Sequence, residues 1–145
     1  NLGLESLHLR MQRHSETALA VAQFLSERED VSWVKYPGLA GDSCYALAQK
    51  YLPKGACGVV SFGVKGGRKA AETFMKGLRL AIIATHVADA KTCCLHPASS
   101  THRQMTDEEL RAAGVSSDLV RMSLGLEAKE DIIQDIRQAL DSIRI

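Results

Sequence analysis

Hydrophobic residues recur along this chain at two spacings, and the two spacings predict two kinds of element. In three stretches, apolar side chains repeat every three or four residues, which is typical of amphipathic helices. These stretches are residues 4–27, 68–78 and 129–142. Strands are predicted instead where β-branched, aromatic or alternating apolar residues cluster between turn residues. These clusters are residues 31–37, 58–64 and 118–127.

The segments between these elements complete the predicted fold. A helix is expected at residues 43–52, and residues 106–114 begin with the Thr-x-x-Glu pattern of a capping box. Residues 78–102 are largely extended, with a break at residues 86–91. Strands alternate with helices, and several connections are short. We therefore expect an α+β fold, in which residues 1–145 form one domain. It would be a two-layer sandwich with helices packed on a mostly antiparallel sheet of about four strands.

The last predicted strand, residues 118–127, carries a charged side chain in its middle. Successive strand residues point to opposite faces of a sheet. One face is continuously apolar and consists of Val120, Met122, Leu124 and Leu126. The other face consists of Leu119, Arg121, Ser123 and Gly125. Ser and Gly are small and leave room above the sheet, so the planar guanidinium of Arg121 could bind a carboxylate there.

A structural role for Arg121 is the alternative. Its side chain could extend to solvent, or it could form an ion pair with Asp118 or Glu127. Most arginines on strands are surface residues, so the strand pattern alone leaves both interpretations open.

Composition narrows the class of protein without identifying a function. Of the 145 residues, 46% are hydrophobic and 24% are charged, as in ordinary soluble domains. The net charge of +1 argues against a nucleic-acid or anionic-membrane partner. No apolar run is long enough to cross a membrane, and residues 1–16 do not contain the apolar region of a signal peptide. The chain does not begin with Met, which fits a piece of a longer protein.

The cysteines and histidines form no recognised metal or catalytic motif. Cys44, Cys57, Cys93 and Cys94 lack metal-ligand spacing, and we expect buried free thiols of a cytosolic protein. His96 and His102 flank a polar loop, but their spacing gives only a weak metal signal. We therefore expect no metal site and no complete catalytic constellation in this chain.

Three long segments of the chain resemble one enzyme family. They are "NLGLESLHLRMQRHSETALAVAQFL", "YLPKGACGVVSFGVKGG" and "HPASSTHRQMTDEELRAAGVSSDLVRMSLGLE". Together they resemble the C-terminal portion of the Cys/Met-metabolism enzymes that use pyridoxal phosphate, most closely the branch that acts on O-acetylhomoserine and sulfide. The resemblance implies the small C-terminal domain of a fold-type-I transferase.

The resemblance also implies a substrate site. In this family, the arginine of the "VR-S-G-E" strand binds the α-carboxylate of the substrate, and Arg121 matches that position. A second segment, "HVADAKT", matches the family segment that contacts the same carboxylate through a polar side chain and a backbone N–H. His86 takes the polar position, Val87 follows it, and Ala88 replaces the usual Gly. Thr101 matches a family threonine near the substrate.

Other parts of the family's active site are expected outside this chain. The lysine that binds the cofactor and the residues that bind its phosphate lie in a large N-terminal domain. This chain should therefore hold no cofactor-binding residues and be inactive alone. The resemblance further implies a cytoplasmic homotetramer that converts O-acetyl-L-homoserine and sulfide into L-homocysteine and acetate.

Three alternatives stay open. The complete enzyme could be another member of the same family, such as a cystathionine γ-synthase, a cystathionine γ-lyase or a methionine γ-lyase. The chain could instead be a free-standing, non-catalytic domain. It could also be a fragment that only completes a subunit interface. A fragment of this kind would expose an apolar patch, for which the helix at residues 4–27 is the best candidate.

Overall fold

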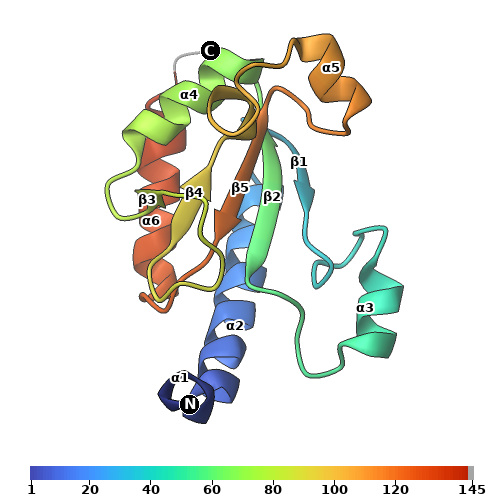
Figure 1. Ribbon diagram of the computed structural model, residues 1–145, viewed down its shortest axis with the longest axis vertical. Helices are drawn as coiled ribbons and strands as arrows, with labels where there is room; N and C mark the ends of the chain where they lie inside the picture. The colour runs from blue at the N-terminus through green and yellow to red at the C-terminus, as the bar shows by residue number, and fades with distance from the viewer. Residues whose placement is uncertain (144–145) are drawn as a thin grey trace.

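Five strands form one mixed sheet, in the order β1-β2-β5-β4-β3, in the computed structural model, which describes residues 1–143 (Figure 1). The strands are β1 (Val31–Lys35), β2 (Val59–Val64), β3 (Ile82–Ile83), β4 (Cys93–Leu95) and β5 (Leu119–Ser123). All neighbouring strands are antiparallel except β3 and β4. The predicted class is confirmed, with one strand more than expected. The extended stretch after residue 78 forms two short strands, separated by the loop at residues 84–92.

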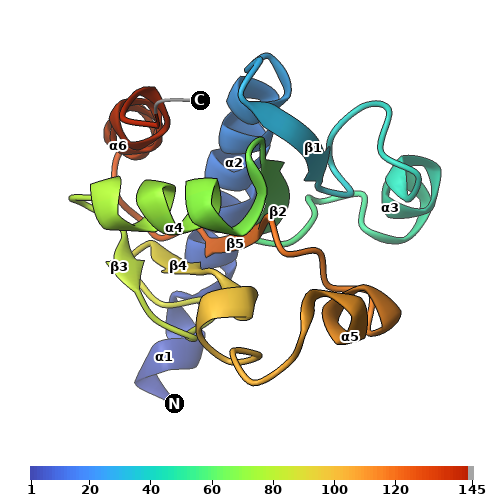
Figure 2. The ribbon, with the colours of Figure 1, turned by 90° about the horizontal axis from the view of Figure 1, so that it is seen from above.

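Three of the helices form the second layer. The helices are α1 (Leu2–Glu5), α2 (Leu7–Ser26), α3 (Tyr45–Tyr51), α4 (Gly67–Gly77), α5 (Asp107–Ala112) and α6 (Lys129–Asp141), with a 3₁₀ turn, η1 (Pro97–Ser99). Helix α6 packs against both α2 and α4, and α2 and α4 pack against the sheet, whereas α3 and α5 stand apart from this layer (Figure 2). The helix predicted at residues 4–27 is two helices, because the chain leaves helical geometry at Ser6.

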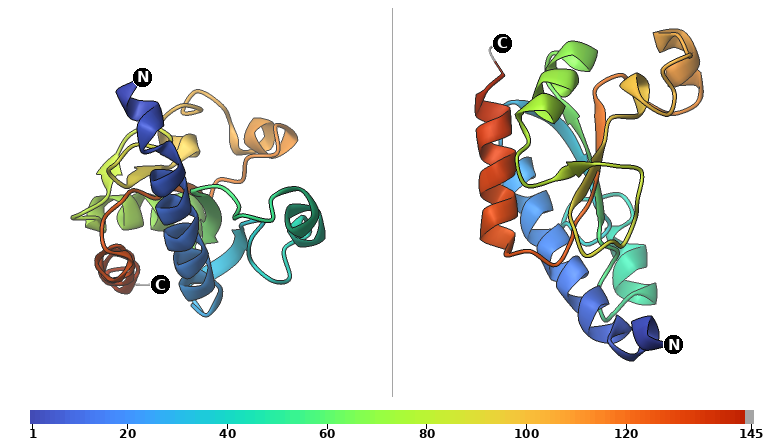
Figure 3. Two further views of the ribbon diagram at one scale, coloured as in Figure 1. Left: turned by 90° about the horizontal axis from the view of Figure 1, so that it is seen from below. Right: turned by 60° about the vertical axis from the view of Figure 1, so that its left-hand side comes forward.

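The core lies between the sheet and these three helices. Alternate residues of β2 and β5 are fully buried, namely Val60, Phe62 and Val64 of β2 and Val120 and Met122 of β5. Leu124, directly after β5, is also fully buried. Phe62 meets Phe74 of α4 edge-to-face, with ring centroids 5.6 Å apart. Figure 3 shows α2 and α6 side by side on this face of the sheet. The opposite face of β5, which carries Arg121, has no such helix layer.

The connection that leads into β3 is fixed by a buried carboxylate. Asp135 of α6 accepts hydrogen bonds from the main-chain N–H groups of Arg79, Leu80 and Ala81, at 2.8, 3.0 and 2.9 Å. Gln138 donates to the same carboxylate at 3.1 Å. A carboxylate offers only acceptors, so it satisfies several N–H groups at once and holds the start of β3 against α6.

The first two helices expose apolar side chains. The N-terminal part of α2 projects beyond the sheet (Figure 1), and the exposed residues are Leu2, Leu4, Leu7, Leu9 and Met11. The second half of α2 is different, since Ala18, Val21 and Leu25 are fully buried. No helix among residues 1–143 is long and apolar enough to cross a membrane.

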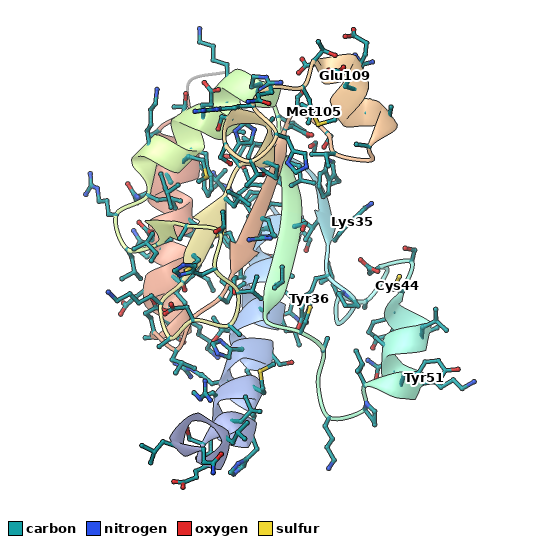
Figure 4. The ribbon with its side chains drawn as sticks, viewed as in Figure 1. Lys35, Tyr36, Cys44, Tyr51, Met105 and Glu109 are labelled. Atoms are coloured by element: carbon teal, nitrogen blue, oxygen red, sulfur yellow. The ribbon has the colours of Figure 1, made fainter. Side chains whose placement is uncertain are left out.

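The expectation that all four thiols are buried is half wrong. All four cysteines are free, but only Cys93 and Cys94 are buried. Cys44 and Cys57 are exposed, because they lie at the irregular ends of short segments rather than in the sheet. Figure 4 shows Cys44 beside α3, away from the sheet. Burial raises the pKa of the Cys93 and Cys94 thiols and so disfavours their reactive thiolate forms.

Thiol titration should separate these two pairs. In the native protein we expect a chromophoric disulfide reagent to modify Cys44 and Cys57 quickly and to leave Cys93 and Cys94 unmodified for hours. In denaturant all four should react. The folded double variant with Cys44→Ser and Cys57→Ser should show no fast reaction. Fast modification of this double variant would contradict the burial of Cys93 and Cys94.

Candidate functional site

Arg121 lies in the middle of the sheet, on the face that the helices leave free. Its cross-strand neighbours are Ser61 on β2 and Leu95 on β4. One end of the guanidinium is fixed, since Nη2 donates to the carbonyl of Thr85 at 3.0 Å. The side-chain Nε is buried and has no partner among residues 1–143. The guanidinium of Arg121 therefore keeps N–H donors that can bind an anion.

The ion pair that was the alternative role for Arg121 is not present among the described residues. Within residues 1–143, Arg121 forms no ion pair, and both proposed partners are engaged elsewhere. Asp118 accepts hydrogen bonds from Ser32 and Trp33, at 2.8 and 3.2 Å. Glu127 accepts from the main chain and hydroxyl of Thr92. The positive charge of Arg121 is therefore not neutralised by either carboxylate.

The loop at residues 84–92 crosses β5 beside Arg121. The main-chain N–H of Ala88 donates to Oγ of Ser123 at 3.0 Å, and Thr85 accepts from Arg121 as described above. These two contacts hold the segment between them, which carries His86 and Val87. The room that the small residues were expected to leave above β5 is thus partly filled by the chain itself.

His86 and Val87 lie in the loop between the two residues that hold it to β5, Thr85 and Ala88. Both side chains are exposed, and Nδ1 of His86 is 3.6 Å from the carboxylate of Asp89. The main-chain N–H of Lys91 lowers the pKa of Asp89, and His86 adds to this effect. The N–H of Val87 donates to no acceptor among residues 1–143. Arg121 therefore offers a charged guanidinium, and Val87 in the adjacent loop offers a free backbone N–H.

Ala88 has a backbone conformation that side chains rarely adopt. Its φ is 59°, and it is the only non-glycine residue in the described chain with a positive φ. A Cβ in this region costs roughly 1–2 kcal/mol. In this backbone conformation the Ala88 N–H donates to Ser123, and the Val87 side chain is exposed to solvent.

Replacing Ala88 with glycine should therefore stabilise the chain. We expect Ala88→Gly to raise the free energy of unfolding by about 0.5–1 kcal/mol, because relief of strain exceeds the added entropy of the unfolded state. Ala90→Gly in the same loop is the matched control. Ala90 lacks a positive φ, so that variant should lose about 0.4–1 kcal/mol. Equal losses in both variants, measured by urea unfolding, would contradict this interpretation.

The structure does not bring Thr101 into contact with Arg121. Thr101 follows η1, and its Oγ1 is hydrogen-bonded to Nδ1 of His102 at 2.8 Å. Both ring nitrogens of the buried His96 are also engaged, with Ser99 at 2.8 Å and the carbonyl of Ser117 at 2.9 Å. No cluster of potential metal ligands is present in the part of the chain that the structure describes.

The residues of this chain do not fit a covalent pyridoxal phosphate site. That cofactor needs an amine sheltered from water, but every lysine side chain here is exposed, including Lys91 beside the loop. Three other residues lie at the site, namely Thr85, Ser123 and Glu127. Ser123 was expected only as a small neighbour of Arg121 and Glu127 only as a possible ion-pair partner, while Thr85 was not expected there at all. Two of them share the strand parity of Arg121, which was the available signal.

Comparison with known proteins identifies the family of this chain. A family model described as "Cys/Met metabolism PLP-dependent enzyme" matches residues 1–141. The chain belongs to this family. Members of the Cys/Met-metabolism family are pyridoxal-phosphate-dependent, so the cofactor expected from the sequence is confirmed at the level of the family.

Curated relatives within the family carry consistent names. An O-acetyl-L-homoserine sulfhydrylase of Leptospira meyeri is 46% identical over 97% of this chain and 32% of its own length. A homocysteine synthase of Schizosaccharomyces pombe is 47% identical over 96% of this chain and 32% of its own length. The chain thus spans about a third of the length of the relatives it matches.

A solved structure shares the fold. It is a putative O-acetylhomoserine (thiol)-lyase from Campylobacter jejuni, determined with a pyridoxyl-lysine monophosphate group. It is 38% identical and superposes with a TM-score of 0.89 over 97% of this chain and 33% of its own.

Proposed function

We propose that this chain is the C-terminal, substrate-side domain of a pyridoxal-phosphate-dependent sulfhydrylase. The complete enzyme would convert O-acetyl-L-homoserine and sulfide into L-homocysteine and acetate. The observation that carries the proposal is the unneutralised guanidinium of Arg121 beside the free N–H of Val87. The names of the relatives support the choice of substrates.

The role of this domain is to hold the amino-acid substrate. Arg121 would bind the α-carboxylate with two of its free donors, and the Val87 N–H would donate to the same group. These hydrogen bonds would fix the orientation of the bonds at the substrate Cα without moving a proton. Bound pyridoxal phosphate supplies the electron sink for the chemistry, and the large domain that holds it would lie outside this chain. This chain alone would be inactive.

The exposed apolar residues of α1 and α2 fit this arrangement. A row of large apolar side chains on a projecting helix indicates a surface that another part of the protein covers. We infer that the N-terminal domain, or a neighbouring subunit of a homotetramer, covers this row, which consists of Leu2, Leu4, Leu7, Leu9 and Met11.

A three-substrate assay tests the function. The complete protein, loaded with pyridoxal phosphate, should form homocysteine from O-acetylhomoserine and sulfide. Cysteine as the second substrate should give little cystathionine, and methionine alone should give little methanethiol. The 145-residue chain should give none of these products. A higher rate with cysteine or methionine would assign the enzyme to another branch of the family.

A further inference from the structure

We propose that Glu127 is a positioning residue for the substrate-binding loop, and that it acts through the buried hydroxyl of Thr92. The proposal rests on the proposed function, because it assumes that the loop at residues 84–92 faces the substrate carboxylate. We refer to Thr92, Gly125 and Glu127 together as the Thr92 clasp. None of the three was assigned a role by the sequence resemblance.

The contacts of the clasp are short, and the one between Thr92 and Gly125 is buried. The Glu127 carboxylate accepts from the main-chain N–H of Thr92 at 2.7 Å and from its hydroxyl at 2.9 Å. The Thr92 hydroxyl also accepts from the N–H of Gly125 at 2.9 Å. Thr92 is fully buried. Beside the clasp, the N–H of Leu126 donates to the carbonyl of Ala90 at 2.8 Å.

The clasp continues the same row of residues that carries the substrate arginine. Arg121, Ser123, Gly125 and Glu127 are alternate residues, and each contacts the loop. Arg121 holds Thr85, Ser123 holds Ala88, and the last two hold Thr92. The loop is thus fixed to one face of β5 and its extension at three successive points. Loosening the last point would let Val87 shift relative to Arg121.

A carboxylate at position 127 matches the two groups that it binds. Both the N–H and the hydroxyl of Thr92 donate to Glu127, and a carboxylate offers only acceptors. The amide of a glutamine would place its own N–H groups opposite one of these donors. The main chain of Glu127 is itself held, because Arg13 of α2 donates to its carbonyl at 3.0 Å. The clasp therefore has a rigid support in the helix layer.

Asp135 offers a matched control. Like Glu127, it is a carboxylate that binds main-chain N–H groups of the connection between α4 and β4. It holds residues 79–81, which precede β3, and it makes no contact with the loop at residues 84–92. A change at Asp135 should therefore weaken the fold without moving the substrate-binding groups.

Steady-state kinetics of the complete enzyme test the proposal. Thr92→Val keeps the shape of the side chain and removes the hydroxyl, and Glu127→Gln removes one acceptor. Both should raise KM for O-acetylhomoserine about tenfold or more while kcat changes less than about threefold. kcat/KM for sulfide should be unchanged. Thr92→Ser keeps the hydroxyl and should restore the wild-type KM. Asp135→Asn should lower the midpoint of thermal unfolding with KM unchanged.

Amide hydrogen exchange provides a readout that needs no turnover. In Thr92→Val, exchange of residues 85–91 should be faster by about tenfold or more, with β2 unchanged. Unchanged exchange there, an unchanged KM, or an equal KM increase in Asp135→Asn would overturn the role of Glu127. Failure of the unmodified enzyme to make homocysteine would instead contradict the proposed function. The exchange result would still decide whether the clasp holds the loop.

Discussion

Replacing Arg121 with alanine in the complete enzyme is expected to lower kcat/KM for O-acetylhomoserine by about a thousandfold. The substitution removes two charge-assisted hydrogen bonds to the substrate carboxylate, worth about 4 kcal/mol together. Most of the loss should appear in KM, because the arginine holds the substrate and moves no proton. The fold should survive, since the Arg121 side chain makes one hydrogen bond, to Thr85, and no ion pair among residues 1–143.

Two further variants make this result specific. Arg121→Lys keeps the charge but loses the fork, so it should recover only part of the lost activity. Arg111→Ala removes an exposed arginine of α5 that pairs weakly with Glu108 at 3.7 Å, and it should leave the kinetics unchanged. Cofactor absorbance should be normal in all three variants. Wild-type kinetics in Arg121→Ala would refute the assignment of the carboxylate site.

Gly125→Ala is expected to destabilise the chain by about 3 kcal/mol, the largest effect on stability that we predict from a single methyl group. An added Cβ would overlap with Oε2 of Glu127, and it would lie 2.5 Å from both the Ala90 carbonyl oxygen and the Thr92 nitrogen. Two of these atoms belong to the main chain. Removing this steric overlap would require the loop at residues 84–92 to move away from β5.

The measurement is urea unfolding of the 145-residue chain, followed by circular dichroism. Gly3→Ala is the control, because its added Cβ meets only the end of the Arg10 side chain, at 3.9 Å. In the short helix α1, alanine should be neutral or slightly stabilising. A loss below about 1 kcal/mol in Gly125→Ala would mean that the loop at residues 84–92 adapts easily and is not tightly held.

The regular elements could be predicted because their signals are local. The capping box of Thr106 and Glu109 is present as expected, and Gly114 ends that helix with a φ of 74°. The alternation in β5 correctly placed Val120 and Met122 in the core and Arg121 on the other face. Periodicity could not reveal the break at Ser6, since both sides of it favour a helix.

The surroundings of Arg121 depended on contacts between distant residues. Thr85 and Arg121 are 36 positions apart, and Thr92 and Glu127 are 35 apart. No local pattern reports which side chain will satisfy which main-chain group across such a distance. The resemblance to the family therefore indicated the segment that holds Val87, while the structure showed what holds it. The roles of Arg121, His86, Val87 and Thr101 toward substrate stay predictions.

The central strand of this sheet is also the last strand to be synthesised. β5 lies between β2 and β4, yet both are made before it. Until a ribosome has translated residue 119 and beyond, β2 and β4 have no common partner, and their facing edges carry unpaired main-chain groups. Open edges of this kind recruit strands from other chains and lead to aggregation. The two halves of the sheet can therefore join only after the final strand has been synthesised.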